Sequence, residues 1–219
     1  MTSIGILGGT FDPVHYGHLR TAMELRQCLG FEEVRFVPCR IPPHDKAPVA
    51  SVDQRLAMLA AAVQDTPGFV VDERELHREG PSYSVDTLTS MRQDFPECPL
   101  SLIVGMDAFA GLTSWHRWEE LLNLAHIVVA HRPGAAPPRD DALQALLDRR
   151  RSCDPADLGR ASFGRILLHS VTQLDISSSA IRDGILRREN QRFLLPDRVV
   201  ELIESSGCYT EAMRRSARA

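Results

Sequence analysis

The stretch from Ile4 to Arg20 constrains the fold of this chain more than any other part of the sequence. Its first residues form an apolar run of the kind found in a buried strand, and Gly8-Gly9 ends that run. From Gly17 onward the apolar residues follow helical spacing. The stretch therefore predicts a strand, a glycine turn, a loop that contains two histidines, and a helix.

The predicted turn has the properties of a phosphate-binding site. Glycines let a ligand approach the backbone closely, and a helix start offers free N–H groups to an anion. His15 and His18 lie where a phosphate would be held. The pattern is neither a P-loop nor the G-x-G-x-x-G fingerprint of dinucleotide-binding proteins. Two other interpretations stay open: ordinary loop histidines, or a metal site formed by Asp12, His15 and His18.

Residues 9–18, Gly-Thr-Phe-Asp-Pro-Val-His-Tyr-Gly-His, resemble the (H/T)xGH signature of the nucleotidylyltransferase superfamily. The resemblance implies that His15 and His18 are catalytic. It also implies that the residues before them, Gly8, Gly9, Thr10 and Phe11, help to bind the triphosphate of ATP.

A second candidate phosphate site is the run Ile176-Ser177-Ser178-Ser179-Ala180-Ile181-Arg182. Serines at a helix start direct hydroxyl and N–H groups outward, and Arg182 follows one turn later, which makes an anion clamp. Taken alone, the run could equally be a serine N-cap with an exposed arginine. It resembles the I-S-S-T-x-I-R motif with which the same superfamily binds the β- and γ-phosphates of ATP. The resemblance implies that ATP is bound by Ile176, Ser177, Ser178, Ser179 and Arg182, with Ser179 keeping the hydroxyl of the usual threonine.

Strands and helices alternate along the chain, which predicts a Rossmann-like α/β fold: a doubly wound parallel sheet with helices on both faces. The expected strands are residues 4–7, 34–38, 69–71, 100–105, 126–131 and 166–168. Because ligands bind at the carboxyl ends of parallel strands, Gly8 and Gly105 should lie on the same side of the sheet.

Helices are expected from Gly17, over Val52 to Gln64 with a Ser51–Gln54 capping box, and from Ser84 as N-cap. Further helices are expected after Trp115 as far as Leu124, and from Asp140 to Arg151. We expect a single domain over residues 1–210 and a frayed tail over residues 211–219.

Composition sets the outer limits of function. The chain has 219 residues and a net charge of −4, which argues against broad nucleic-acid binding. Its five cysteines are scattered without C-x-x-C pairs, so neither a disulfide framework nor a zinc site is indicated. It shows no signal peptide and no apolar run of membrane-spanning length. We expect a cytoplasmic protein with no membrane partner, and the sequence leaves a homo-oligomer open.

Further blocks narrow the resemblance to bacterial nicotinate-mononucleotide adenylyltransferases. They are Pro42-Pro43-His44, residues 81–88, Gly105-Met106-Asp107 and Trp115. By this resemblance Trp115 stacks on the pyridine ring, Tyr83 and Ser84 lie at the nicotinate carboxylate, and Asp107 contacts ribose. Gly105 and Arg132 belong to the ATP site, and His44 to the mononucleotide site. Asp45 stands where a basic residue is usual, and Lys46, the only lysine, takes that role in our interpretation.

The implied reaction is adenylyl transfer from ATP to the 5′-phosphate of nicotinate mononucleotide, with Mg²⁺ bridging the ATP phosphates. No protein metal site is expected. Rival interpretations are the same chemistry on another acceptor (pantetheine phosphate, glycerol phosphate or nicotinamide mononucleotide), an aminoacyl-tRNA synthetase fragment, and a non-catalytic nucleotide sensor. The synthetase K-M-S-K-S element is missing, and both histidines and Arg182 are retained.

Overall fold

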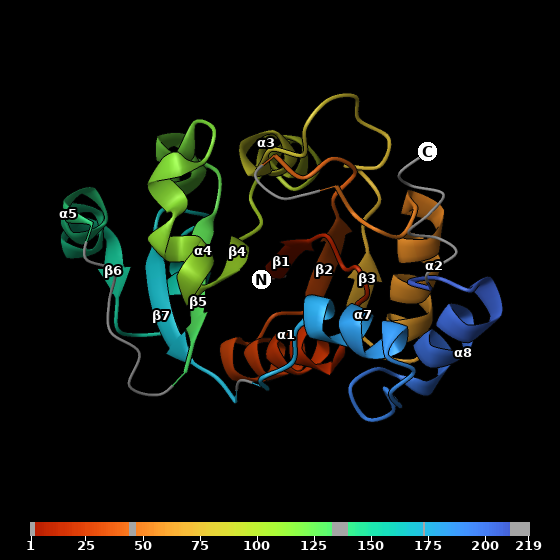
Figure 1. Ribbon diagram of the computed structural model, residues 1–219. Helices are drawn as coiled ribbons and strands as arrows, with labels where there is room; N and C mark the ends of the chain where they lie inside the picture. Colours follow the sequence, from red (N-terminus) through yellow and green to blue (C-terminus); the bar gives the residue numbers. More distant parts are fainter. Residues whose placement is uncertain (1–2, 44–46, 133–139, 173, 211–219) are drawn as a thin grey trace.

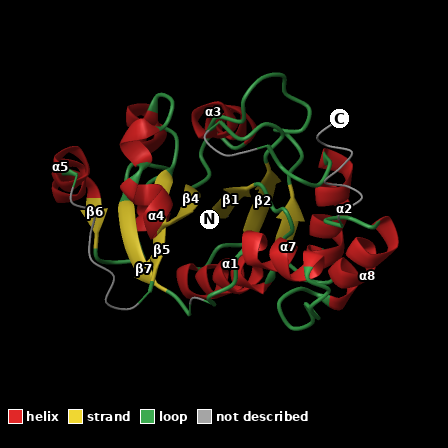
Figure 2. Cartoon of the chain, viewed as in Figure 1, coloured by secondary structure: helices red, strands yellow, loops and turns green. Residues whose placement is uncertain are grey.

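The computed structural model describes residues 3–43, 47–132, 140–172 and 174–210. In this part of the chain seven parallel strands form one sheet, in the order β3-β2-β1-β4-β5-β7-β6 (Figures 1 and 2). The strands are β1 (Ile4–Gly9), β2 (Glu33–Pro38), β3 (Phe69–Val71), β4 (Leu100–Gly105), β5 (His126–His131), β6 (Arg151–Ser152) and β7 (Ile166–Ser170). The predicted Rossmann-like fold class is confirmed.

Helices cover both faces of the sheet (Figure 1). They are α1 (Tyr16–Leu29), α2 (Val52–Val63), α3 (Ser84–Asp94), α4 (Met106–Ala110), α5 (Asp141–Arg150), α6 (Asp157–Arg160), α7 (Ser178–Leu186) and α8 (Asp197–Ser206). Two 3-10 helices, η1 (Leu112–Ser114) and η2 (Trp118–Asn123), lie between β4 and β5.

The two faces have separate hydrophobic cores, because successive strand residues point to opposite sides. On β5, Val128 belongs to the core that includes residues of α1, α2, α7 and α8, whereas Ile127 and Val129 belong to the core that includes residues of α3, α5 and η2. Helix α8 lies against α2, at the right of Figure 1. The last helix is thus part of the same core as the first.

The chain reverses its winding between β1 and β4. Strands β1, β2 and β3 extend the sheet in one direction, and β4 then returns to pair with the other side of β1, with Ile4 opposite Leu100. This is the topological switch point, where ligands bind in open α/β sheets. The carboxyl ends of β1 and β4, marked by Gly8 and Gly105, lie on adjacent strands as predicted.

Several predicted boundaries need correction. Residues 118–123 form a 3-10 helix, not an α-helix, and Arg151 ends α5 and begins the short strand β6, which was not predicted. The capping residue of α3 is Tyr83, since the first helical carbonyl bond runs from Thr87 N to Tyr83 O; Ser84 is already helical. The Ser51–Gln54 capping box of α2 is confirmed. The tail over residues 211–219 lies outside the described residues.

Candidate active site

The start of α1 is closely packed at Gly17. A Cβ atom added at Gly17 would come within 2.9 Å of Cε1 and Nδ1 of the His15 ring and 3.5 Å of the Ile176 carbonyl oxygen. Any side chain at position 17 would therefore displace His15. The glycine between the two histidines is required by close packing, since its backbone does not need a positive φ.

The two histidines lie against each other at the start of α1. Their rings stack with centroids 3.8 Å apart and planes 29° apart, and the Phe11 ring meets His18 edge-on. The His15 backbone N–H donates to His18 Nδ1 over 3.3 Å. Because Nδ1 accepts this bond, the neutral His18 ring carries its proton on Nε2. His18 is thereby a hydrogen-bond donor through Nε2.

Both rings are neutral near neutral pH. Burial lowers the pKa of His15 from its ordinary 6.5 to about 4. Burial, followed by the charge of neighbouring His15, lowers the pKa of His18 to about 3. The Nδ1 atom of His15 is buried and has no hydrogen-bond partner in the structure. The site thus presents two uncharged imidazoles, and among the described residues one nitrogen of His15 has no partner, an arrangement suited to receiving an anion.

The predicted second phosphate motif lies directly beside this loop. Ser177 caps α7 by accepting from Ala180 N, and the Ser178 hydroxyl donates to the Pro13 carbonyl oxygen over 2.9 Å. Arg182 donates to the Asp12 carbonyl oxygen over 2.6 Å and to the Ser179 hydroxyl over 3.1 Å. The two motifs are more than 160 residues apart in the sequence and are joined in space by side-chain hydrogen bonds.

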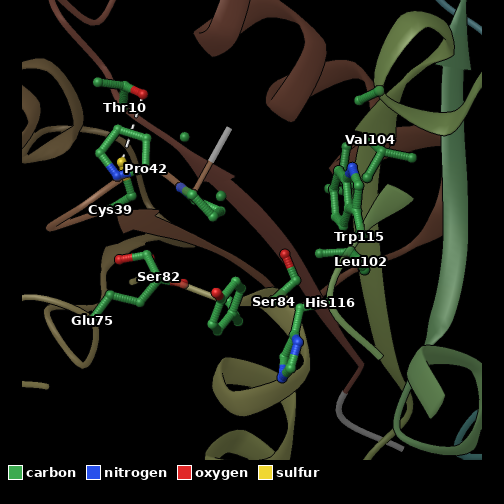
Figure 3. Close-up of a pocket in the computed structure, with 16 residues that line it drawn as sticks. Thr10, Cys39, Pro42, Glu75, Ser82, Ser84, Leu102, Val104, Trp115 and His116 are labelled. Atoms are coloured by element: carbon green, nitrogen blue, oxygen red, sulfur yellow. Dashed lines mark hydrogen bonds between the residues drawn. The ribbon is translucent and has the colours of Figure 1, made fainter. Parts of the chain in front are cut away.

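A cavity of about 340 Å³ opens at the carboxyl ends of β1 and β4. Of the predicted site residues, six line it: Gly8, Gly9, Thr10, Tyr83, Ser84 and Trp115. Figure 3 shows Trp115 beside Leu102 and Val104, across the cavity from Thr10, Cys39 and Pro42. The Tyr83 ring lies 4.3 Å from the ring of His116. The cavity therefore has an apolar wall on the β4 side and a polar end formed by the start of α3.

Three other predicted residues lie at the ends of β4 and β5 or the start of α4, and two lie outside the described residues. Gly105 precedes α4, and Asp107 lies exposed in the first turn of that helix. Arg132 follows β5 and forms an exposed ion pair with Asp175 over 3.2 Å. His44 and Lys46 lie outside the described residues.

The geometry around Asp12 gives no support to the alternative of a metal site at Asp12, His15 and His18. The Asp12 carboxylate accepts from the backbone N–H groups of Val49 and Ala50. Within residues 3–43, 47–132, 140–172 and 174–210, no group of three His, Cys, Asp or Glu side chains could hold a metal ion. None of the helices in these ranges has the length and apolar character to cross a bilayer.

The sequence and its relatives assign this site to a family. The cytidylyltransferase-like family model matches residues 6–184. A protein of Aeromonas hydrophila, named "Probable nicotinate-nucleotide adenylyltransferase", is 48% identical over 209 residues, which cover 95% of this chain and 98% of the relative. A protein of the same name from Methylococcus capsulatus is also 48% identical, over 95% of this chain and 100% of its own length. The chain belongs to the nicotinate-nucleotide adenylyltransferase family.

Solved structures agree on the fold. The Plasmodium falciparum nicotinic acid mononucleotide adenylyltransferase, in its complex with NaAD, superposes with a TM-score of 0.73 over 95% of this chain and 98% of its own. At 17% sequence identity this similarity supports the fold alone.

In this member of the nicotinate-nucleotide adenylyltransferase family, the cavity includes residues that the sequence did not single out. Glu75 and His116 line it, and Glu75 is buried. The Thr87 hydroxyl donates to the Glu75 carboxylate over 2.5 Å. Burial raises the pKa of Glu75, opposed by hydrogen bonds from Thr87 and Ser82. The stretch Asp72–Glu75 consists of charged residues, and no local signal in it indicates that Glu75 is buried.

Proposed function

We propose that this protein transfers the adenylyl group of ATP to the 5′-phosphate of nicotinate mononucleotide, which gives nicotinate adenine dinucleotide and pyrophosphate in NAD biosynthesis. One observation carries the proposal: the histidine loop and the α7 motif are hydrogen-bonded to each other, next to a cavity lined by Trp115, Tyr83 and Ser84. A candidate triphosphate site and a cavity able to take a pyridine ring, both at the carboxyl ends of the strands, suit a reaction between two nucleotides.

In the proposed reaction an oxygen of the mononucleotide phosphate attacks the α-phosphorus of ATP in line with the leaving pyrophosphate. A phosphate monoester is already a nucleophile near neutral pH, so no general base is required. Catalysis then consists of positioning and charge stabilisation, as in other phosphoryl transfers. The Nε2–H of His18 is a suitable donor to the α-phosphate, and His15 lies 3.8 Å away between ring centroids to assist it.

The α7 motif is suited to the outer phosphates. Arg182 offers a permanently charged planar fork, and the N-terminus of α7 adds N–H donors from Ser178 and Ser179. Ile176 and Ser177 position that helix start, since the Ile176 carbonyl lies near Gly17 and Ser177 is the N-cap. Gly8, Gly9, Thr10 and Phe11 would complete the phosphate cradle.

We propose that Mg²⁺ enters with ATP and is held by phosphate oxygens and water. The absence of a carboxylate cluster among the described residues fits a cation of this kind, which keeps several waters and takes few protein ligands. When bound, it neutralises charge on the triphosphate. The protein's own cationic contribution is Arg182.

The remaining assignments extend the same proposal. Asp107 and Gly105, at the end of β4, are suited to ribose, and Arg132, at the end of β5, to the adenine side of ATP. His44 and Lys46 would contact the mononucleotide phosphate. Residues 1–210 would act as a single domain.

A pyrophosphate-release assay with a panel of acceptors tests the function. With Mg-ATP we expect rapid release with nicotinate mononucleotide and much slower release with nicotinamide mononucleotide, pantetheine phosphate or glycerol phosphate. Faster release with another acceptor would support adenylyl transfer but contradict nicotinate mononucleotide as the substrate. No release with any acceptor, despite ATP binding, would favour a nucleotide sensor.

A further inference from the structure

One buried carboxylate joins four separate segments of the chain at the candidate triphosphate site. Asp12 Oδ1 accepts from the Ala50 N–H over 3.0 Å and from the Tyr209 hydroxyl over 2.8 Å. Asp12 Oδ2 accepts from the Val49 N–H over 2.8 Å and lies 3.6 Å from an Arg182 nitrogen. The same arginine donates to the Asp12 backbone carbonyl.

Tyr209 reaches this point from the end of α8, 197 residues away in the sequence. It is 1% exposed and has a backbone φ of +68°, a conformation that a tyrosine adopts only when its surroundings fix it. Burial and the neighbouring Asp12 carboxylate raise the pKa of Tyr209, so its hydroxyl keeps its proton and is the donor. The carboxylate therefore receives three fixed hydrogen bonds.

These contacts determine how strongly Asp12 attracts Arg182. A buried carboxylate with three donors has most of its charge satisfied, and its ion pair with Arg182 stays long at 3.6 Å. With one donor lost, the unsatisfied oxygen would draw the guanidinium closer, because a buried charge without a partner is costly. Arg182 would then be less available to a triphosphate.

We propose that Tyr209 is a positioning residue for nucleotide binding: its hydroxyl holds the Asp12 carboxylate so that the Arg182 guanidinium is not drawn further onto Asp12 and can engage ATP phosphates. The proposal rests on the assignment of Arg182 to ATP in the proposed function. It gives the segment that follows α8, which lies outside the two sequence motifs, an indirect part in the site.

The test is Tyr209→Phe, which removes the hydroxyl and keeps the buried ring. The matched control is Thr210→Val, because the Thr210 hydroxyl bonds to the Gly207 carbonyl within the same turn. Binding of a non-hydrolysable ATP analogue is measured by calorimetry, and the Michaelis constants for ATP and nicotinate mononucleotide are measured separately. We expect Tyr209→Phe to weaken analogue binding and raise the KM for ATP about tenfold, with the KM for the mononucleotide changed less than twofold. Thr210→Val should change none of these.

A double-mutant cycle identifies the route of the effect. In an Arg182→Ala background, Tyr209→Phe should add less than twofold to the loss of analogue affinity, because the residue through which it acts is gone. A full tenfold further loss, or an equal rise in both Michaelis constants, would show a general structural role and overturn the proposal. Unchanged analogue binding in Tyr209→Phe would also overturn it. The binding arm needs no acceptor, so it decides this proposal even if no acceptor supports pyrophosphate release.

Discussion

The backbone N–H of His15 donates to Nδ1 of His18, three residues further along the first turn of α1. This bond sets the tautomer of His18 and leaves Nε2–H as its only ring donor. A histidine held in this way can stabilise a developing negative charge without being protonated first. The first prediction follows from that arrangement.

Replacing His18 with alanine should lower kcat by about a hundred- to a thousandfold, the usual effect of losing one donor to a transition-state oxyanion. ATP affinity should fall much less. Steady-state kinetics of pyrophosphate release measure both. The control is His77→Ala, because the His77 side chain is 76% exposed and pairs with the exposed Glu73. Retention of more than a tenth of the wild-type kcat would remove His18 from the mechanism.

The depressed pKa values of the two histidines predict loss of stability in acid. Unfolded histidine binds a proton near pH 6.5, whereas folded His15 and His18 bind one only near pH 4 and 3. The stability that the two neutral histidines contribute is therefore present above pH 6.5. It is lost as the pH falls toward 4, because the unfolded state takes up more protons than the folded state. Each histidine should lower the free energy of unfolding by about 2 kcal/mol as the pH falls from 6.5 to 5.

Urea denaturation at several pH values between 5 and 8 measures this slope. His18→Asn should show a shallower fall in the free energy of unfolding than the wild type, since one titrating group is gone. An unchanged slope in His18→Asn would contradict the assignment of the effect to this residue.

The sequence predicted most of what depends on local patterning. Three local features form as expected, and each depends on residues close together in the sequence. They are the apolar strand β1, the capping box at Ser51 and the serine-capped helix start at Ser177. The fold follows because alternating strands and helices permit few arrangements.

What the sequence did not predict depends on contacts between distant residues. The bond from Tyr209 to Asp12 spans the whole chain, and no periodicity marks either residue as its partner. Strand β6 is two polar residues that pair with β7, too short to leave a pattern. Glu75 is buried by the loop that carries Ser82 and by α3. Its sequence neighbours therefore gave no indication of its burial.

Gly17→Ala should reduce kcat at least tenfold, because the added methyl group would lie 2.9 Å from the His15 ring and push it out of position. Gly159→Ala is the matched control, since a Cβ atom at that helical position has nothing within 4 Å. Thermal unfolding measured alongside separates displacement of His15 from loss of fold. Wild-type kcat in Gly17→Ala would mean that the position of His15 does not matter to the reaction.

Arg182→Ala should weaken ATP binding and leave adenosine binding unchanged, because the guanidinium is assigned to the outer phosphates. Arg182→Lys should recover only part of the loss, since an ammonium cannot reproduce the planar fork. Calorimetric titrations with ATP and with adenosine measure the difference. Arg187→Ala serves as control, because Arg187 follows α7, is exposed and pairs with Glu189. An equal loss of both affinities would point to misfolding.

The last prediction concerns the choice between acid and amide at the pyridine ring. The first N–H groups of α3, from Ser84 onward, have no acceptor within the helix, and Ser84 lines the cavity with Trp115. A group of donors there stabilises the nicotinate carboxylate and leaves the NH₂ of the amide facing other donors. An unpaired buried polar group costs about 1–3 kcal/mol, and a hydrogen bond to a charged group contributes about 1.5–3 kcal/mol.

Together these effects should favour the acid by at least about tenfold, and by more than about a hundredfold if both act fully. Measurement of kcat/KM for the two mononucleotides under identical Mg-ATP decides the matter. Trp115→Ala should damage both substrates equally, because they present the same ring face to the indole. A wild-type kcat/KM ratio near one, or in favour of the amide, would contradict nicotinate mononucleotide as the preferred substrate and leave the proposal of adenylyl transfer standing.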